Sequence, residues 1–147
     1  MPTYLLTWNP QKWPREKLEP WFKKGIYEDS WSSGVTKKIS PKDRVFLIKL
    51  GAEEPRGIMG SGWATSECFK EEHWEPTLAA KGKKALYNEV YLDTFFDPQK
   101  KIFPRSELYG GVYSKMHWDA QASGVTIPAD VAEQLEKDWA TFVKVPA

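Results

Sequence analysis

Tryptophan stands beside small polar residues at two places in the chain, and each place could bind a flat ring. The first is Trp8-Asn9-Pro10, at the end of an apolar run, and the second is Trp31-Ser32-Ser33-Gly34. An indole can stack on the face of a ring, while amide and hydroxyl groups bond to its edge. A flipped nucleobase is held by both kinds of contact. These two segments therefore predict a pocket for a base, supported by a strand pair over residues 43–64.

Local charge rather than net charge would have to attract a nucleic acid. The formal net charge is only +1, whereas a general polyanion binder is usually more basic. Lysine and arginine gather at residues 37–56, 81–84 and 100–105. Contacts to the DNA backbone, which position phosphates without reading sequence, are expected at Lys37, Lys38, Lys49 and Arg56. A solvated surface of mixed sign is the alternative explanation.

The chain shows no pattern for metal binding or catalysis. Cys68 and His73 are separated by a spacing that is not typical of a zinc site, and His117 stands alone. An HNH nuclease needs adjacent His and Asn ligands, but the chain has only two histidines. Residues 57–62 are rich in glycine, yet no Lys-Ser or Lys-Thr follows them, so they do not form a phosphate loop. We expect no metal, no cofactor and no enzyme activity, and a catalytic domain would belong to a longer parent protein.

The length and composition predict one domain over residues 1–147. Of these 147 residues, 41% are hydrophobic and 14% are aromatic, which provides enough apolar surface for a core. Eight tryptophans exceed what such a core readily hides, so some should line a pocket or an interface. The single cysteine, Cys68, fits a reducing compartment, and the sequence shows no secretory signal and no membrane-spanning run. We therefore expect a cytoplasmic protein without a membrane partner.

Alternation and helical periodicity predict the elements that would position these residues. Gly25 can end a helical segment at residues 13–24, in which Leu18, Trp21 and Phe22 would be buried. Pro128 can open the clearest helix, at residues 128–142. We expect strands at residues 3–8, 44–50, 57–63 and 88–96, a turn at residues 31–34 and a short helix at residues 104–109. This order predicts an α+β domain with a small curved sheet or barrel.

Four sequence motifs together resemble an EVE domain of the PUA superfamily. They are YLLTWNP at residues 4–10, the Trp-Ser pair at Trp31, DRVFLIKLG at residues 43–51 and PRGIMGSG at residues 55–62. The likeness is greatest to the EVE domains at the N-terminus of modification-dependent HNH restriction endonucleases. It continues through His73-Trp74, residues 90–98 and residues 118–124, and so covers nearly the whole chain.

The resemblance implies a PUA-like β-pseudobarrel with flanking helices, related to the YTH readers of methyladenine. It implies that a modified base leaves the duplex and enters a pocket at one mouth of the barrel. The base would be 5-methylcytosine or 5-hydroxymethylcytosine in double-stranded DNA of a bacterial or archaeal cell. The domain would then be the specificity module of a modification-dependent restriction endonuclease, with a nuclease domain or protein as its partner.

The resemblance also implies roles for individual residues. Asn9 would bond to a Watson–Crick edge, and Trp31 would be a cage residue. The implied pocket residues are Trp8, Asn9, Trp31, Ser32, Ser33 and Trp63. The residues implied to lie near DNA are Trp118, Gln121, Ser123 and Gly124. Many EVE relatives carry Ser-Glu-Pro in place of Trp8-Asn9-Pro10, so the contacts to the base edge should differ here.

Structural roles are the alternatives for most of these residues. Trp8 and Trp63 could be core residues at strand positions, and Asn9 could serve only the turn before Pro10. Gly60 and Gly62 mark either a bulge or a backbone floor for a ligand.

Two other functions also remain open. One is a small hydrolase of a modified nucleoside, as in the ASCH branch of the same superfamily, which would use a polar trio such as Thr7, Lys49 and Glu89. The other is a reader of modified RNA or of N6-methyladenine, because PUA and YTH relatives read RNA.

Overall fold

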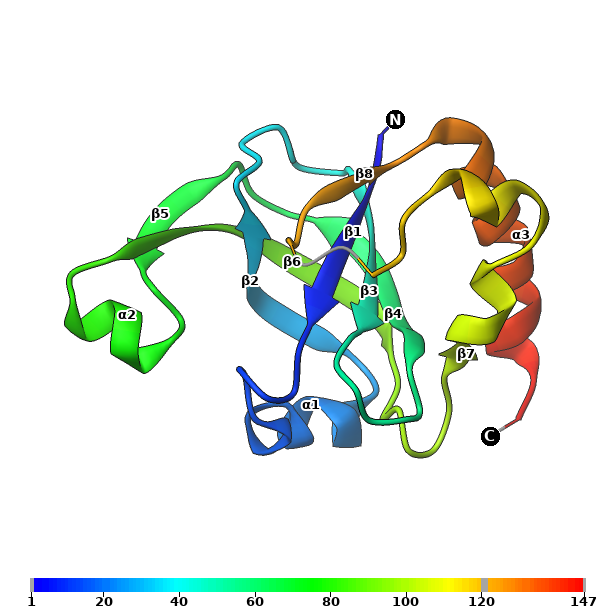
Figure 1. The fold of residues 1–147 in the computed structure, drawn as a ribbon, viewed down its shortest axis with the longest axis horizontal. Helices are drawn as coiled ribbons and strands as arrows, with labels where there is room; N and C mark the ends of the chain where they lie inside the picture. Colours follow the sequence, from blue (N-terminus) through cyan, green and yellow to red (C-terminus); the bar gives the residue numbers. More distant parts are fainter. Residues whose placement is uncertain (1, 120–121, 147) are drawn as a thin grey trace.

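The computed structural model describes residues 2–119 and 122–146 (Figure 1). The strands are β1 (Thr3–Trp8), β2 (Tyr27–Gly34), β3 (Arg44–Lys49), β4 (Gly57–Ala64), β5 (Phe69–Glu72), β6 (Lys84–Phe95), β7 (Phe103–Pro104) and β8 (Val125–Ile127). The α-helices are α1 (Glu19–Lys24), α2 (Pro76–Ala80) and α3 (Ala129–Lys144). The 3-10 helices are η1 (Arg15–Lys17), η2 (Arg105–Leu108) and η3 (Gly111–Lys115). The predicted α+β class is therefore confirmed.

One curved sheet organises the fold, with the strand order β2-β6-β4-β3-β1-β8. β1 and β3 run parallel, and the other neighbours along this path are antiparallel. β5 and β7 leave the path by pairing with β6 and β4. The path ends at β2 on one side and at β8 on the other, and no pairing joins these two strands within the described residues. The sheet curls but does not close into a barrel by strand pairing.

The strand and helix predictions at both ends of the chain are confirmed. β1 has the predicted bounds, β3 and β4 form the predicted hairpin, and α3 follows Pro128. The predicted helical segment at residues 13–24 divides into η1 and α1, and Gly25 ends α1 in the left-handed conformation with φ 73°. Leu18 is buried, while Trp21 and Phe22 are partly buried against the core.

The predicted turn at residues 31–34 is wrong, because these residues belong to β2. β2 pairs with β6 from Tyr27 opposite Leu92 to Gly34 opposite Leu86. Its sequence, YEDSWSSG, carries few apolar residues, so hydrophobic alternation does not reveal it. Backbone pairing along the length of β6 supplies the order that the side chains do not indicate. The short β5, β7 and β8 and the helices α2 and η3 were also not predicted.

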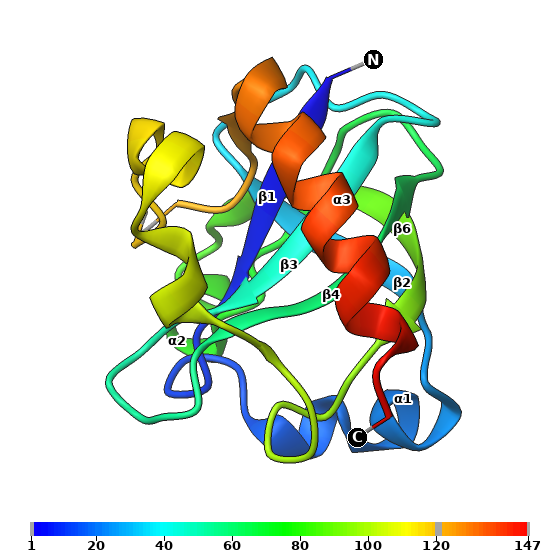
Figure 2. The same cartoon turned by 90° about the vertical axis from the view of Figure 1, so that its right-hand side faces the viewer.

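Two hydrophobic clusters lie on the two faces of the sheet. The inner cluster contains Leu6, Trp8, Trp31 and Leu47, and it fills the concave side. The outer cluster lies under α3, which crosses the sheet diagonally in Figure 2. Trp139 of α3 is buried there, and its indole N–H donates to Ser61 Oγ at 2.8 Å. The helix therefore covers the outer face, and the tryptophans expected at the pocket, Trp8 and Trp31, belong to the inner face.

The glycines of β4 serve the packing of the sheet against itself. A Cβ atom at Gly62 would overlap the carbonyl of Tyr91 in β6, and one at Gly60 would lie 2.9 Å from the carbonyl oxygen of Thr94. The register of β4 shifts against both β3 and β6 near these positions. Of the two readings of these glycines, the structure favours a bulge with close strand approach over a floor for a ligand.

Candidate functional site

A cavity of about 740 Å³ opens beside the end of β1, between β2 and β5. β8 pairs with β1 only from Thr3 to Leu5. Beyond Leu5, side chains take the place of a strand partner. The N–H of Thr7 donates to Ser123 Oγ at 3.1 Å, and the carbonyl of Thr7 accepts from Trp31 Nε1 at 3.1 Å. The cavity thus lies at the seam that strand pairing leaves in the sheet.

Seven aromatic residues from four strands and two loops line the cavity. They are Trp8, Trp13, Tyr27, Trp31, Phe69, Trp74 and Tyr87. Trp13 and Trp74 are partly exposed, and their rings meet edge to face with centroids 6.5 Å apart. Phe69 and Tyr87 stack across the β5–β6 pair with centroids 5.9 Å apart. The wall therefore offers flat faces in more than one orientation.

Trp31 is held rigidly in this wall. It is 8% exposed, and its ring packs edge to face on Tyr27, with centroids 5.4 Å apart and an interplanar angle of 83°. The Tyr27 hydroxyl donates to the carbonyl of Ser30 at 2.7 Å. Burial, together with the carboxylates of Asp29 and Glu89, raises the pKa of Tyr27 far above its ordinary value, so it stays a donor. Trp31 presents a fixed surface and has no free N–H for a ligand.

Trp8 and Asn9 both line the cavity but contribute differently to it. Trp8 is 2% exposed, and its indole donates to the carbonyl of Trp13 at 2.8 Å, so it is mainly a core residue. Asn9 Oδ1 accepts from the N–H of Gln11 at 3.0 Å, which shapes the turn after β1. Within the described part of the chain, Asn9 Nδ2 makes no hydrogen bond. This amide nitrogen is available to a ligand.

The two serines predicted for the pocket have different surroundings. Ser32 lines the cavity, and its Oγ accepts from the N–H of Gly34 at 3.3 Å, which leaves its hydroxyl proton to donate. Ser33 is fully buried, 3.9 Å from the sulfur of Cys68, and does not line the cavity. Of the two serines, only Ser32 can therefore reach a ligand in the cavity.

Gly34 and Gly124 allow two chain segments to cross at the edge of the cavity. A Cβ atom at Gly34 would overlap the carbonyl of Ser123, and one at Gly124 would overlap the carbonyl of Ser33. Both glycines have positive φ angles, 68° and 83°. The N–H of Gly124 also donates to the carbonyl of Leu5 at 2.9 Å. The segment that carries Ser123 is thereby fixed against both β1 and β2.

The structure does not bring Trp63 or Trp118 to the cavity. Trp63 is 38% exposed and lies under the guanidinium of Arg44, 4.7 Å from its ring centroid. Trp118 is buried in the outer cluster and donates to the carbonyl of Tyr113 at 3.0 Å. Gln121 lies outside the described residues. In the segment expected near DNA, Ser123 lines the cavity, and Gly124 packs closely against the carbonyl of Ser33 beside it.

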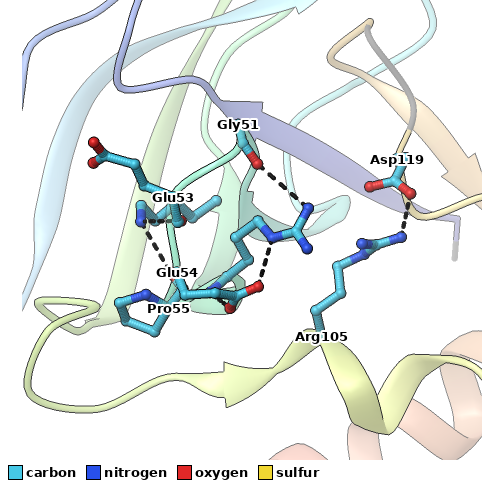
Figure 3. A network of polar contacts seen from close by, with 8 residues as sticks. Gly51, Glu53, Glu54, Pro55, Arg105 and Asp119 are labelled. Atoms are coloured by element: carbon cyan, nitrogen blue, oxygen red, sulfur yellow. Dashed lines mark hydrogen bonds and ion pairs between the residues drawn. The ribbon is translucent and has the colours of Figure 1, made fainter.

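The four basic residues expected at the DNA backbone have unlike environments. Lys37 and Lys38 are exposed in the segment between β2 and β3. Lys49 is buried, and its ammonium donates to the carbonyls of Glu53 at 3.1 Å and Pro55 at 2.9 Å (Figure 3). Burial is also the main cause that lowers its pKa. Lys49 therefore stabilises the β3–β4 turn and is not available to a phosphate.

Arg56, the fourth of these residues, is partly exposed at the same turn. Its Nε donates to Glu54 Oε1 at 2.9 Å, and its Nη1 donates to the carbonyl of Gly51 at 3.4 Å. The bond to Glu54 is the main cause that lowers the pKa of this carboxyl group.

Charged groups at the cavity are distributed unevenly. The lining residues include the carboxylates of Asp29, Glu71 and Glu72 and the ammonium groups of Lys12 and Lys84. All three carboxylates come from β2 and β5, and the Lys84 ammonium lies opposite Glu72 in the β5–β6 pair, so this edge carries three carboxylates and one ammonium group and has a net negative charge. The opposite edge, at Asn9, carries the amide nitrogen.

The trio considered for a hydrolase is not assembled. Thr7 lines the cavity, but Lys49 and Glu89 do not. Glu89 lies on β6, opposite Ser30, and burial followed by the charge of Asp29 raises its pKa. Among residues 2–119 and 122–146, no three side chains of the His, Cys, Asp and Glu types gather in a way that could hold a metal ion. In the same ranges, no helix is both long and apolar enough for a membrane span.

A second cavity, of about 730 Å³, lies between α1 and the C-terminal end of α3. Arg15 and Asp97 form a two-point ion pair in its wall, with Nη1 2.7 Å from Oδ1. None of the residues expected at the pocket or near DNA lines this cavity.

Five aromatic residues that line the cavity are not among those that the sequence predicts for the pocket. The sequence predicts a helix at Trp13 and places Trp74 in a motif, and it predicts no role for Tyr27, Phe69 or Tyr87. Phe69 belongs to β5, whose sequence FKEE reads as polar. The available signal was the pair of aromatic residues, Phe69 and Trp74, on either side of an acidic run.

Comparisons with known proteins give the fold alone. No protein-family model matches this chain, and no curated protein matches it. Among solved structures, it is similar to a hypothetical protein from Leishmania major, with a TM-score of 0.62 and 14% sequence identity. The similarity covers 96% of this chain and 96% of that chain. The α+β arrangement is therefore shared over nearly the full length of both proteins.

Proposed function

We propose that this protein is a PUA-like DNA reader that takes a modified cytosine, flipped out of the duplex, into the cavity beside β1. The observation that carries the proposal is the combination of seven aromatic lining residues with available polar groups in one cavity of about 740 Å³. In a modification-dependent restriction system, such a reader would supply specificity to a nuclease domain or partner protein.

The aromatic wall supplies the energy that base flipping needs. Extruding a base costs a few kcal/mol in lost stacking and pairing. Stacking of a base on an aromatic side chain is worth about 1–3 kcal/mol. Trp13 and Trp74 are partly exposed and suit this contact, whereas Trp31 is a fixed back wall. Because the planes of the Trp13 and Trp74 rings are 88° apart, a base that stacks on one ring meets the other edge to face. These two contacts together offset the cost of extrusion.

The polar groups at the cavity edges match the edge of cytosine. The exocyclic amine of cytosine donates to carboxylates, and Asp29, Glu71 and Glu72 line one edge of the cavity. Asn9 Nδ2 and the Ser32 hydroxyl are donors for the ring nitrogen and the carbonyl oxygen of the base. The acidic edge therefore supports a pyrimidine that carries an amino group.

Discrimination of the modification should be modest. A buried methyl group adds about 0.8 kcal/mol, which corresponds to about a fourfold preference in affinity. A hydroxymethyl group that gains one hydrogen bond adds about 1 kcal/mol.

The test is an anisotropy titration with matched duplexes that carry cytosine, 5-methylcytosine or 5-hydroxymethylcytosine at one position. Trp74→Ala should remove the preference, and Trp63→Ala, a tryptophan outside the cavity, should keep it. Equal affinity of the wild type for all three duplexes contradicts the proposal. A matched RNA competitor that displaces the DNA would assign the reader to RNA.

A second candidate rests on the carboxylates themselves. An aromatic cage with an acidic edge is also suited to a methylated ammonium group, which binds to aromatic faces. Titration with a trimethyllysine peptide and with its unmethylated match separates the two candidates. Tighter binding of the methylated peptide supports this candidate, and binding of neither peptide contradicts it.

A further inference from the structure

We propose that Arg56 and Arg105 form a phosphate-binding site at the Asn9 edge of the cavity, and that Asp119 closes this site until DNA displaces it. The identity of the ligand, a DNA phosphate, rests on the proposed function. The arrangement of the three side chains is drawn in Figure 3.

Arg105 has a buried guanidinium group that lacks a full set of hydrogen-bond acceptors. It is 7% exposed, and within the described residues its buried Nε makes no hydrogen bond. The Tyr109 ring lies 5.1 Å from the guanidinium carbon and is itself 60% exposed. Buried polar groups are almost always bonded, so an unpaired guanidinium donor indicates a missing partner. The partner must be an acceptor.

Asp119 supplies the one side-chain acceptor that Arg105 has among the described residues. Its carboxylate pairs with Arg105 Nη2, and its side chain is 48% exposed. The pair therefore joins a fixed, buried cation to a solvent-accessible anion at the start of the segment that leads to Ser123. An exposed carboxylate in this position can be exchanged for another oxyanion without disturbing the core.

Arg56 brings a second guanidinium to the same place. The N–H of Arg105 donates to the carbonyl of Arg56 at 2.8 Å, which ties the two backbones together. The hydrogen bond with Glu54 is the main cause that raises the pKa of Arg56, and the charge of Asp119, the partner of Arg105, also raises it. Arginine is suited to phosphate because its planar fork can donate two parallel hydrogen bonds. Glu54 pairs with Arg56 in the same way as Asp119 pairs with Arg105.

The site borders the cavity. Arg56 Nη1 donates to the carbonyl of Gly51, and a Cβ atom at Gly51 would lie 3.5 Å from Asn9 Oδ1. On the other side, Asp119 precedes the cavity residues Ala122 and Ser123 by a few positions. A phosphate next to a flipped nucleotide would therefore meet cations at this edge, opposite the acidic edge formed by β2 and β5.

The test measures the affinity of four variants for a modified duplex and for its unmodified match at several salt concentrations. Asp119→Asn removes the competing anion and should raise the affinity for both duplexes about three- to tenfold. Arg56→Gln should lower both affinities and reduce the slope of log K against log salt by about 1. Arg105→Lys keeps the charge but loses the fork, and should lower both affinities without changing the slope. Thermal melts check that each variant is folded.

Glu136→Gln is the matched control. It frees Arg44, another guanidinium paired with an exposed carboxylate, at a site that does not line the cavity. It should leave the affinity unchanged. A gain equal to that of Asp119→Asn, or an Asp119→Asn variant that binds no better than wild type, overturns the proposal.

The ratio of the two affinities separates this proposal from the proposed function. If wild type shows no preference for the modified duplex but Asp119→Asn still raises both affinities, the phosphate site stands and the base-reading function fails. If the preference is present but Asp119→Asn and Arg56→Gln change nothing, the phosphate site fails alone. Absence of duplex binding by both wild type and Asp119→Asn overturns both.

Discussion

Trp31 donates its indole N–H to the carbonyl of Thr7 at 3.1 Å, and this bond joins β2 to the half of β1 that pairs with β3 on one side but has no partner from β8 on the other. The N–H of Thr7 is satisfied by Ser123 Oγ at 3.1 Å. One tryptophan therefore has two roles, since its nitrogen closes the seam in the sheet and its ring forms the back wall of the cavity.

Substitution of Trp31 should separate these roles. Trp31→Phe keeps an aromatic face but leaves the Thr7 carbonyl unpaired, which should lower the free energy of unfolding by about 1–2 kcal/mol. Trp31→Ala also leaves a void and should lower it by about 3–5 kcal/mol. Urea denaturation measures both values, and the duplex titration should show that only the alanine variant loses the preference. A phenylalanine variant as stable as wild type would show that the bond to Thr7 contributes nothing.

Gly124→Ala should be far more destabilising than Gly82→Ala. Both glycines have positive φ angles, 83° and 77°, so each alanine carries a similar backbone strain of about 1 kcal/mol. Gly82 has nothing within 4 Å of a Cβ atom, whereas at Gly124 the Cβ would overlap the Ser33 carbonyl. We expect an additional loss of about 2 kcal/mol at Gly124 because one chain segment must move. Equal losses in parallel urea denaturation curves would mean that the crossing is not tight.

Trp63→Ala should have little effect on stability. The indole is 38% exposed and is stacked under Arg44, and such surface contacts are worth about 0.5–1 kcal/mol. The change in the free energy of unfolding should stay near this value in guanidinium denaturation. A loss of several kcal/mol would place Trp63 in the core after all.

Asp97→Asn should change the acid sensitivity of the fold. The hydrogen bond from Arg15 is the main cause that lowers the pKa of Asp97. A carboxyl group whose folded-state pKa lies below its unfolded value of about 3.9 stabilises the protein above that pH. This stabilisation is lost as the pH falls through the folded-state pKa. After allowance for solvent screening, wild type should exceed the variant by about 1 kcal/mol at pH 7.

Urea denaturation from pH 7 to pH 2 measures this difference. The two stability curves should converge at the acidic end. Curves that stay parallel would show that Asp97 does not titrate with unfolding.

Elements with strong apolar patterns could be predicted from the sequence. β3 is buried on both faces and reads as a continuous apolar run, and α3 carries an apolar stripe after Pro128. β2 could not be recognised in this way, because its order comes from pairing with β6 and its side chains include Asp29 and three serines. Hydrophobic patterns in a sequence indicate which side chains are buried. They do not indicate which backbone segments pair in a sheet.

The cavity residues that lie next to one another in the sequence could be predicted. Those that meet only through contacts between distant segments could not. Asn9 and Ser32 lie next to tryptophans in the sequence, and both line the cavity. Phe69 and Tyr87 reach it only because β5 folds back on β6. Lys49 can be buried because two backbone carbonyls of a turn accept its hydrogen bonds. The positions of backbone carbonyls depend on the fold and cannot be predicted from residue types.

The short β8 has a consequence for how this chain behaves among other copies of itself. An unpaired strand edge is a template for association with another chain, and proteins protect such edges with side chains or bulges. Beyond Leu5, the edge of β1 is capped by an indole and a hydroxyl in place of a strand. The hollow and the protection against aggregation are therefore the same structure. A β8 lengthened by two residues would continue the ladder along β1 where Ser123 and Trp31 now bond to Thr7, so a sheet of this shape keeps the hollow only while this edge stays incomplete.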